Sequence, residues 1–190
     1  MKLMELYDAM LWEVGEGSSK LFPYKMDMDN DYQAQYIIDG EANGEQVIIR
    51  LHLFYTTLSA RDVEDIRDNQ FDDDDELGVF VTKVYDDIRD GIKIVNVMFE
   101  WDNAPKAEMT FTDVNDTKYM FRLMATIKKI ISDIVARENI GAIAFSSAST
   151  KGDMGARRDR LYDLFIKKAV PTAREISLGR WARKKYFIFK

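Results

Sequence analysis

Apolar residues recur every three or four positions in three segments of this chain, which is the spacing of an amphipathic helix. The longest stripe runs from Met120 to Val135, and Asp116 or Thr117 is placed to cap its first turn. The other two stripes lie near the N-terminus and in a basic stretch of the C-terminal third. The pattern predicts helices over residues 1–15, 120–135 and 156–168.

Other segments alternate apolar and polar residues, as half-buried strands do. In "EQVIIRLHLFYTTL" every second residue from Ile49 to Tyr55 is apolar, with Arg50 and His52 among those between. This segment and "YQAQYIIDG" flank the turn signal "DGEANGE", which predicts an antiparallel hairpin. A second hairpin is predicted from "GVFVTKVYDD" and "GIKIVNVMFEWD", joined around "DIRDG". Further strands are expected at "AEMTFTD", "IGAIAF", "AREISLGR" and "KKYFIFK".

The most acidic stretch, residues 59–76, ends in "DDDDE" and predicts a solvated loop. Neither this stretch nor "DMDND" at residues 27–31 has the turn glycine and closing glutamate of an EF-hand calcium loop. His52 is the only histidine in the sequence, and one histidine does not make a multi-histidine metal site. We therefore expect no bound metal, and a packing or hydrogen-bonding role for His52, with a general-base role as the alternative.

The order of these elements predicts one α+β domain over residues 1–190, an α/β sandwich of helices on a largely antiparallel mixed sheet. A chain of 190 residues is long enough to bury a core. The absence of cysteine from the sequence excludes disulfides, thiolate nucleophiles and cysteine-based metal sites. No apolar run has the length of a membrane span, and the N-terminus lacks a signal-peptide pattern, so we expect an intracellular, soluble protein.

The net charge of −6 is unevenly distributed along the chain. Residues 1–116 carry 10 Lys and Arg against 27 Asp and Glu, whereas residues 117–190 carry 17 against 6. The basic C-terminal part favours anionic partners. Two alternatives stay open: the two parts pair with each other, or the charge only keeps the surface soluble.

The chain is organised around residues 140–168, which read as the strand "IGAIAF", the polar loop "SSASTKGDMG" and the helix "ARRDRLYDLFIKK". This succession, after antiparallel strands and a long helix, resembles the GNAT (N-acyltransferase) superfamily, with Leu161-Tyr162 where that family often has Leu-Tyr. The resemblance implies a GNAT-like fold. For an active member it also implies acetyl-CoA as cofactor and Tyr162 as the general acid that reprotonates the coenzyme A thiolate.

The same region is similar to a group of small tailed-phage proteins. Their shared pattern is a Thr-Val/Ile helix, then I-x-F-S, then S/A-R-x-x-L-Y, and it covers roughly the last 75 residues. The matching elements here are Ala125 to Ile127, Ile143 to Ser146, and Ala156 to Tyr162. This resemblance implies a bacteriophage protein located in the host cytoplasm or in the virion.

The sequence departs from an active GNAT enzyme in the loop before the long helix. These enzymes hold the pyrophosphate of acyl-CoA on the backbone N–H groups of a Q/R-x-x-G-x-G/A loop. This chain has "TDVNDTKYM" there, and it contains no glycine between Gly91 and Gly141. Asp113 and Asp116 place negative charge where the pyrophosphate would bind. The asparagine that usually precedes the tyrosine is also missing.

We therefore favour a binding protein over an enzyme. The hypothesis is a non-catalytic phage accessory or virion-associated protein on a GNAT-like scaffold, without a cofactor, that recognises a host or viral macromolecule. A host or phage protein is the expected partner. Nucleic acid is an alternative partner, because aromatic residues among basic ones suit single strands. No membrane partner is expected, and the oligomeric state is left open.

The predicted binding surface is basic and C-terminal, and we call it the C-terminal basic surface. Its residues are Lys151, Arg157, Arg158, Arg160, Arg180, Trp181, Arg183, Lys184 and Lys185, with Arg174 and Tyr186 nearby. Arginine suits phosphate and carboxylate groups because its guanidinium donates two parallel hydrogen bonds. For Trp181 and Tyr186 the alternative is ordinary packing in a strand. The alternative for the whole protein is a divergent acetyl-CoA-dependent N-acyltransferase that uses Tyr162.

Overall fold

The computed structural model describes residues 21–42, 45–69, 75–101, 117–146, 166, 170–178 and 184–189. Within these residues the chain forms three helices and seven strands. In chain order they are β1 (Tyr24–Asp29), β2 (Gln33–Ala42), β3 (Glu45–Ser59), α2 (Ala60–Asp68), α3 (Glu76–Ile88), β4 (Gly91–Trp101), α4 (Thr117–Glu138), β5 (Ala142–Ser146), β6 (Arg174–Ile176) and β7 (Lys184–Ile188). None of these helices is long and apolar enough to cross a lipid bilayer.

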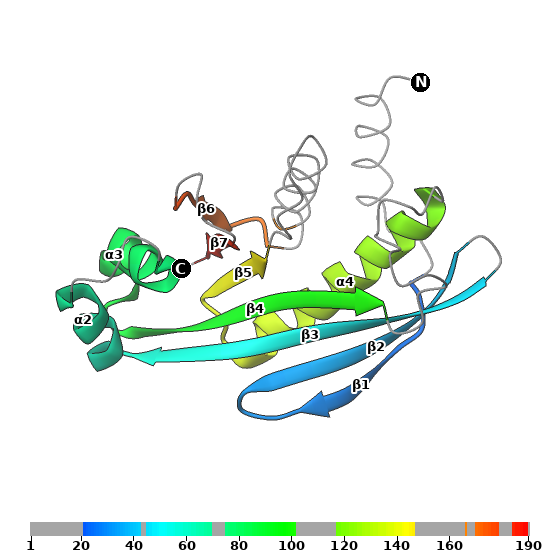
Figure 1. Ribbon diagram of the computed structural model, residues 1–190, viewed down its shortest axis with the longest axis horizontal. Helices are drawn as coiled ribbons and strands as arrows, with labels where there is room; N and C mark the ends of the chain where they lie inside the picture. Colours follow the sequence, from blue (N-terminus) through cyan, green and yellow to red (C-terminus); the bar gives the residue numbers. More distant parts are fainter. Residues whose placement is uncertain are drawn as a thin grey trace, which may run out of the picture. The chain divides into compact units, whose positions relative to one another are not determined.

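The strands form one open sheet in the order β1-β2-β3-β4-β5-β7-β6 (Figure 1). The pairs β1–β2, β5–β7 and β6–β7 are antiparallel, and β4 and β5 are parallel. Two strands that α4 connects therefore run in the same direction, as expected for a strand–helix–strand crossover. The prediction of a mixed α+β fold with a mostly antiparallel sheet is confirmed.

The chain divides into two compact units, and β3, β4 and α4 continue from one into the other. The first unit comprises residues 1–52 and 99–131. Its core contains apolar residues of β2, β3 and α4, among them Ile38, Leu51 and Ile127. The Thr126 hydroxyl is fully buried there: it accepts the backbone N–H of Phe22 at 2.9 Å and donates to the Arg122 carbonyl at 2.7 Å.

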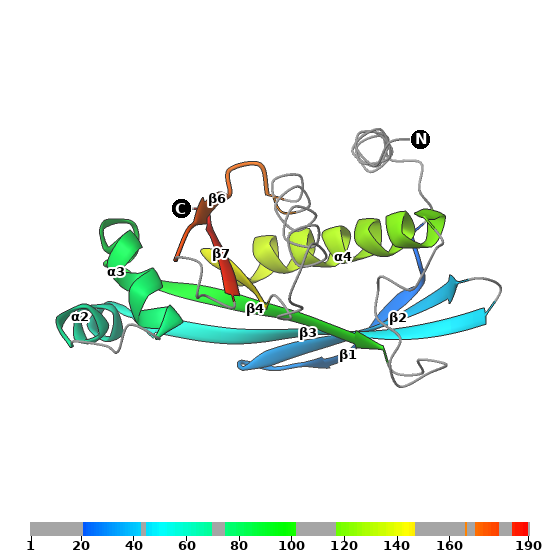
Figure 2. The same cartoon turned by 45° about the horizontal axis from the view of Figure 1, so that its top comes forward.

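The second unit comprises residues 53–98 and 132–190. Its core joins α2 and α3 to strands β4, β5 and β7, and Figure 2 shows these two helices side by side where β3 ends and β4 begins. Phe80 of α3 stacks on Tyr186 of β7, with 4.5 Å between the ring centroids. Val63 of α2 and Ile88 of α3 are fully buried in the same core.

Several predicted elements are confirmed. The long helix is α4, and the segments on either side of "DGEANGE" are the neighbouring strands β2 and β3. "GIKIVNVMFEWD" contains β4, and "IGAIAF" contains all of β5 except its last residue, Ser146. The last two strands pair as expected. The alternation along β3 is also as predicted, because Ile49 and Leu51 are buried while Arg50 and His52 are half-buried.

The prediction that "GVFVTKVYDD" is a strand is wrong, because this segment lies in α3. Its valines, phenylalanine and tyrosine have high strand propensity. However, Phe80, Val81, Val84 and Ile88 are also spaced for one helix face, and all four are buried. Asp75 caps the helix by accepting the backbone N–H of Leu77 at 3.1 Å. Tertiary burial of that face decided the conformation.

The predicted acidic loop over residues 59–76 is wrong in part, because Ala60–Asp68 form helix α2. A capping box begins this helix: the Ser59 side chain accepts the backbone N–H of Asp62, and the Asp62 carboxylate accepts the backbone N–H of Ser59. Strand β1 was not predicted at all. Three predictions lie outside the described residues: the helix over 1–15, the strand "AEMTFTD", and the helix over 156–168 except for Ile166, which is helical and buried.

Candidate binding surface

Most of the C-terminal basic surface lies outside the described residues. This holds for Tyr162 and for seven of the nine surface residues: Lys151, Arg157, Arg158, Arg160, Arg180, Trp181 and Arg183. The other two, Lys184 and Lys185, begin strand β7. The described strands β5 and β7 nevertheless show where the chain stands just before and just after the part of the sequence that contains the other seven residues.

Strands β5 and β7 bring those entry and exit points together. β5 ends at Ser146, and β7 begins at Lys184. The two residues are cross-strand partners at the end of the antiparallel β5–β7 ladder. Opposed residues in such a ladder have Cα atoms about 4.5–5.5 Å apart. The chain therefore leaves β5 after Ser146 and enters β7 at Lys184 at the same end of this ladder, with β6 between them in the sequence.

Two of the basic side chains contact acidic partners within the protein. Lys185 forms an ion pair with Glu175 of β6, with 3.4 Å between Nζ and Oε1, and its side chain is 22 % exposed. Arg174 of β6 pairs with Asp87 of α3 through Nη2 and Oδ2. The second pair joins the basic C-terminal part of the chain to the acidic N-terminal part, so the charge asymmetry is partly satisfied internally.

Tyr186 packs inside the protein, as the packing alternative required. It is 2 % exposed and stacks on Phe80. Burial is the main cause that raises the pKa of Tyr186 to about 12, and the nearby carboxylates of Glu76 and Asp75 contribute. Tyr186 therefore supports β7 from the core and does not belong to an exposed aromatic surface.

A second polar cluster, not predicted from the sequence, joins β3, β4 and α4. Lys93 forms an ion pair with Glu138, with 2.8 Å between Nζ and Oε2, and its ammonium lies 4.4 Å from the ring centroid of Tyr55. Arg137 contacts the other oxygen of Glu138 at 2.8 Å. The hydrogen bonds from Lys93 and Arg137 hold the pKa of Glu138 below its usual value. The arrangement ties the end of α4 to the sheet.

Two shallow hollows are lined by described residues. One, of about 510 Å³, lies in the first unit and combines apolar, acidic and basic groups of Phe22, Pro23, Asp39, Gly40, Glu41, Gln46 and Arg122. The Arg122 guanidinium lies 4.2 Å from the Phe22 ring centroid and donates to the Leu21 carbonyl. The other, of about 340 Å³, lies beside α2 and is lined by Thr57, Leu58, Asp62, Asp65, Ile66 and Asn69.

Among the residues that the structure describes, no three His, Asp or Glu side chains gather as a metal site would need. Asp27 and Asp29 of the "DMDND" segment lie on strand β1. His52 lies half-buried on β3. The ion pairs above join α3 to β6, β6 to β7 and α4 to β4.

Comparison with known proteins adds no family to this picture. No protein-family model matches the chain, and no curated protein gives a significant match.

Proposed function

We propose that this chain is a non-catalytic binding protein that recognises an anionic region of a host or phage protein through the C-terminal basic surface. The proposal includes a phage origin, an accessory or virion-associated role and a GNAT-like scaffold. Part of the order on which the resemblance was based, namely a strand, the long helix, a strand and a final strand pair, occurs here as β4–α4–β5 and β6–β7 and supports the scaffold.

The observation that carries the proposal is the cross-strand pairing of Ser146 with Lys184. The segment with Lys151 follows β5 in the sequence and the segment with Arg180 precedes β7, and Ser146 and Lys184 mark these two strand ends. Lys151 and Arg180 are 29 positions apart in the sequence, yet the strand ends that their segments follow and precede lie opposite each other. The position of these two strand ends side by side supports the proposal that the C-terminal basic surface is continuous.

The composition of the two segments suits carboxylate-rich protein surfaces. Arg157, Arg158, Arg180 and Arg183 each carry a guanidinium, a group that can bind a carboxylate through two parallel hydrogen bonds. Trp181 adds an amphipathic aromatic group of the kind enriched at protein interfaces. Complementary charge accelerates encounter with an anionic partner and suppresses binding to basic ones.

Affinity capture with matched variants tests the proposal. The tagged full chain, the variant Arg180→Gln/Arg183→Gln and the control Arg61→Gln/Arg89→Gln capture proteins from infected or expressing cells, with quantification by mass spectrometry. The control removes the same charge from exposed positions at α2 and α3. We expect one acidic protein to be captured equally by the parent and the control, and at least fivefold less by the first variant. Equal capture by all three chains contradicts the proposal.

A further inference from the structure

Strand β1 is the outermost strand of the sheet among the described residues, where it is hydrogen-bonded to β2 (Figure 1). An edge strand has one side on which its backbone N–H and C=O groups can pair with a further strand. Many extended peptides bind proteins in this way, with main-chain hydrogen bonds that give affinity and alternate side chains that give specificity.

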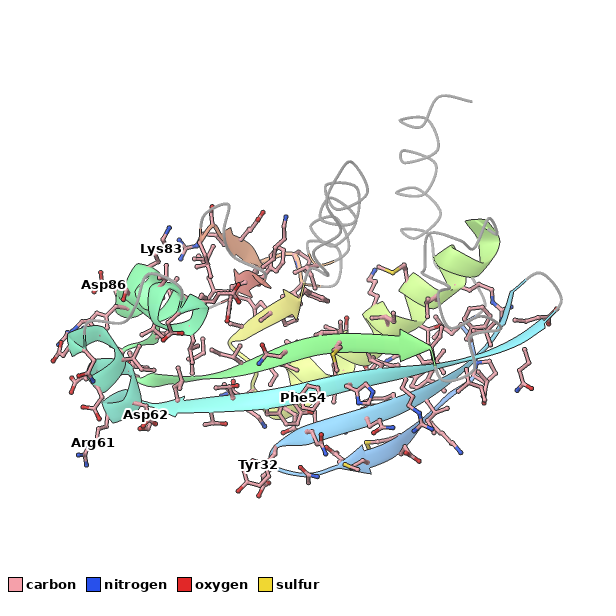
Figure 3. The ribbon with its side chains drawn as sticks, viewed as in Figure 1. Tyr32, Phe54, Arg61, Asp62, Lys83 and Asp86 are labelled. Atoms are coloured by element: carbon pink, nitrogen blue, oxygen red, sulfur yellow. The ribbon has the colours of Figure 1, made fainter. Side chains whose placement is uncertain are left out.

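Exposed apolar side chains gather along this strand and its flanks. The described residues expose six large hydrophobic side chains, and four of them fall within residues 21–32: Leu21, Met26, Met28 and Tyr32. Tyr32 is 79 % exposed at the turn between β1 and β2 (Figure 3). A local concentration of this kind indicates an interaction site, and methionine adapts readily to a partner surface.

The same hairpin is strongly acidic. Residues 24–42 contain one basic residue, Lys25. They contain five acidic residues, all exposed: Asp27, Asp29, Asp31, Asp39 and Glu41. Two copies of this chain paired edge to edge would bring like charges together, which is destabilising. Opposite charges across a strand pair are stabilising. The charge therefore favours a basic strand and disfavours a second copy.

Hydrogen bonds hold the hairpin in shape without a partner. The Asn30 side-chain oxygen accepts the backbone N–H groups of Tyr32 at 2.9 Å and Gln33 at 3.0 Å, and the Asn30 N–H donates to the Gln33 carbonyl at 2.9 Å. The pairing register of β1 with β2 shifts between Met26 and Met28. An ordered strand lowers the entropic cost of binding, and a bulge on an edge limits indiscriminate pairing.

We propose that β1 is a docking edge for a short, extended, basic segment of a partner protein, which adds to the sheet as a strand beyond β1. Its backbone pairs with residues 24–29, its Lys or Arg side chains lie beside Asp29 and Asp31, and its apolar side chains contact Met28 and Tyr32. This site has the opposite charge to the C-terminal basic surface and is independent of it.

Peptide binding to the full chain tests this site. The probe is an eight-residue peptide of alternating Lys and Val, compared with a Glu and Val peptide and with a Lys and Val peptide that is N-methylated at its four central amides. N-methylation keeps the charge but prevents strand pairing. We expect the first peptide to bind at least tenfold more tightly than either of the others, and to slow hydrogen exchange of the amides of residues 24–29.

Matched variants separate the acidic edge from the overall charge. We expect Asp29→Asn/Asp31→Asn to weaken binding of the Lys and Val peptide about three- to tenfold, because each exposed charge contributes modestly to the affinity. The control Asp86→Asn/Asp90→Asn removes the same charge from α3 and the turn after it, and should stay within about twofold of the parent. Equal affinity of the N-methylated peptide, protection only outside residues 24–29, or β1 amides that are already fully protected in the free chain would each overturn the proposal.

Discussion

Single buried polar groups connect residues that lie far apart in this sequence. The Thr126 hydroxyl on α4 accepts the backbone N–H of Phe22, 104 positions away. A buried N–H group that loses its acceptor retains the cost of its removal from water. Thr126 is therefore important for the way the chain before β1 packs on α4, although its side chain is small.

Replacement of Thr126 by valine tests that hydrogen bond. Thr126→Val keeps the shape of the side chain but removes the acceptor, and we expect the free energy of unfolding in urea to fall by about 1–3 kcal/mol. Thr82→Val is the control, because Thr82 is exposed and its hydroxyl donates to the Gly78 carbonyl within α3. The control should change stability by about 0.5 kcal/mol or less. Equal effects of the two substitutions would contradict the role of Thr126.

The raised pKa of Tyr186 predicts that the folded protein loses stability at alkaline pH. Its pKa is raised to about 12 in the folded protein, against about 10 for an unfolded tyrosine. The unfolded chain therefore loses this proton first, and the stabilisation that is complete below pH 10 is lost as the pH rises towards 12. The unfolding free energy of the parent relative to that of Tyr186→Phe should be constant up to about pH 9 and should fall above pH 10. A difference that is unchanged at pH 11 would show that Tyr186 ionises as freely in the folded as in the unfolded chain.

At the scale of helices and strands, the hydrophobic pattern of the sequence identified the elements that have a clear apolar stripe, alternation or run. It located α4, whose apolar residues form one stripe, strands β2 and β3, whose buried residues alternate, and the shorter apolar runs of β4, β5, β6 and β7. It failed for α3, whose strand-forming residues pack as a helix on Tyr186. It missed α2, although Ser59 and Asp62 carry the spacing of a capping box. It missed β1, whose alternation of methionine and aspartate has no buried face.

Gly91 joins α3 to β4 in a conformation that other residues rarely adopt. Its φ angle is +98°, and a Cβ atom there would lie 2.7 Å from the Leu58 carbonyl oxygen. We expect Gly91→Ala to lower the free energy of unfolding by about 1–3 kcal/mol, through strain and the clash with backbone. Asp90→Ala, one residue earlier and exposed, should change it by about 0.5 kcal/mol or less. Urea unfolding of both variants measures these changes. An unchanged free energy of unfolding in Gly91→Ala would show that position 91 does not require glycine.

For the whole molecule, the sequence predicted the fold class better than the site. Charge balance and arginine content indicated a basic C-terminal surface, but no pattern in the sequence shows which charges find internal partners. Arg174 of β6 pairs with Asp87 of α3, in a segment that was itself predicted as a strand. Conversely, the exposed methionines and aspartates of β1 could be interpreted as a docking edge only once the position of β1 in the sheet was known.

The binding role also predicts that acetyl-CoA does not bind. The segment before the long helix has no glycine for a pyrophosphate cradle, and Asp113 and Asp116 add negative charge there. Calorimetric titration of the full chain with acetyl-CoA should give no heat beyond dilution, and 1 mM acetyl-CoA should leave Tm unchanged. A saturable heat signal or a Tm increase of several degrees would favour the acyltransferase with Tyr162 as general acid.

The most direct measurement is the salt dependence of affinity for the captured partner, made with the parent, Arg180→Gln/Arg183→Gln and Arg61→Gln/Arg89→Gln. Charge-mediated binding weakens as salt screens it. We predict that the parent and the Arg61/Arg89 variant lose affinity along the same steep line, and that the Arg180/Arg183 variant binds more weakly at low salt with a shallower slope. Three superimposed lines, or affinity that does not change with salt, would contradict the C-terminal basic surface as the binding site.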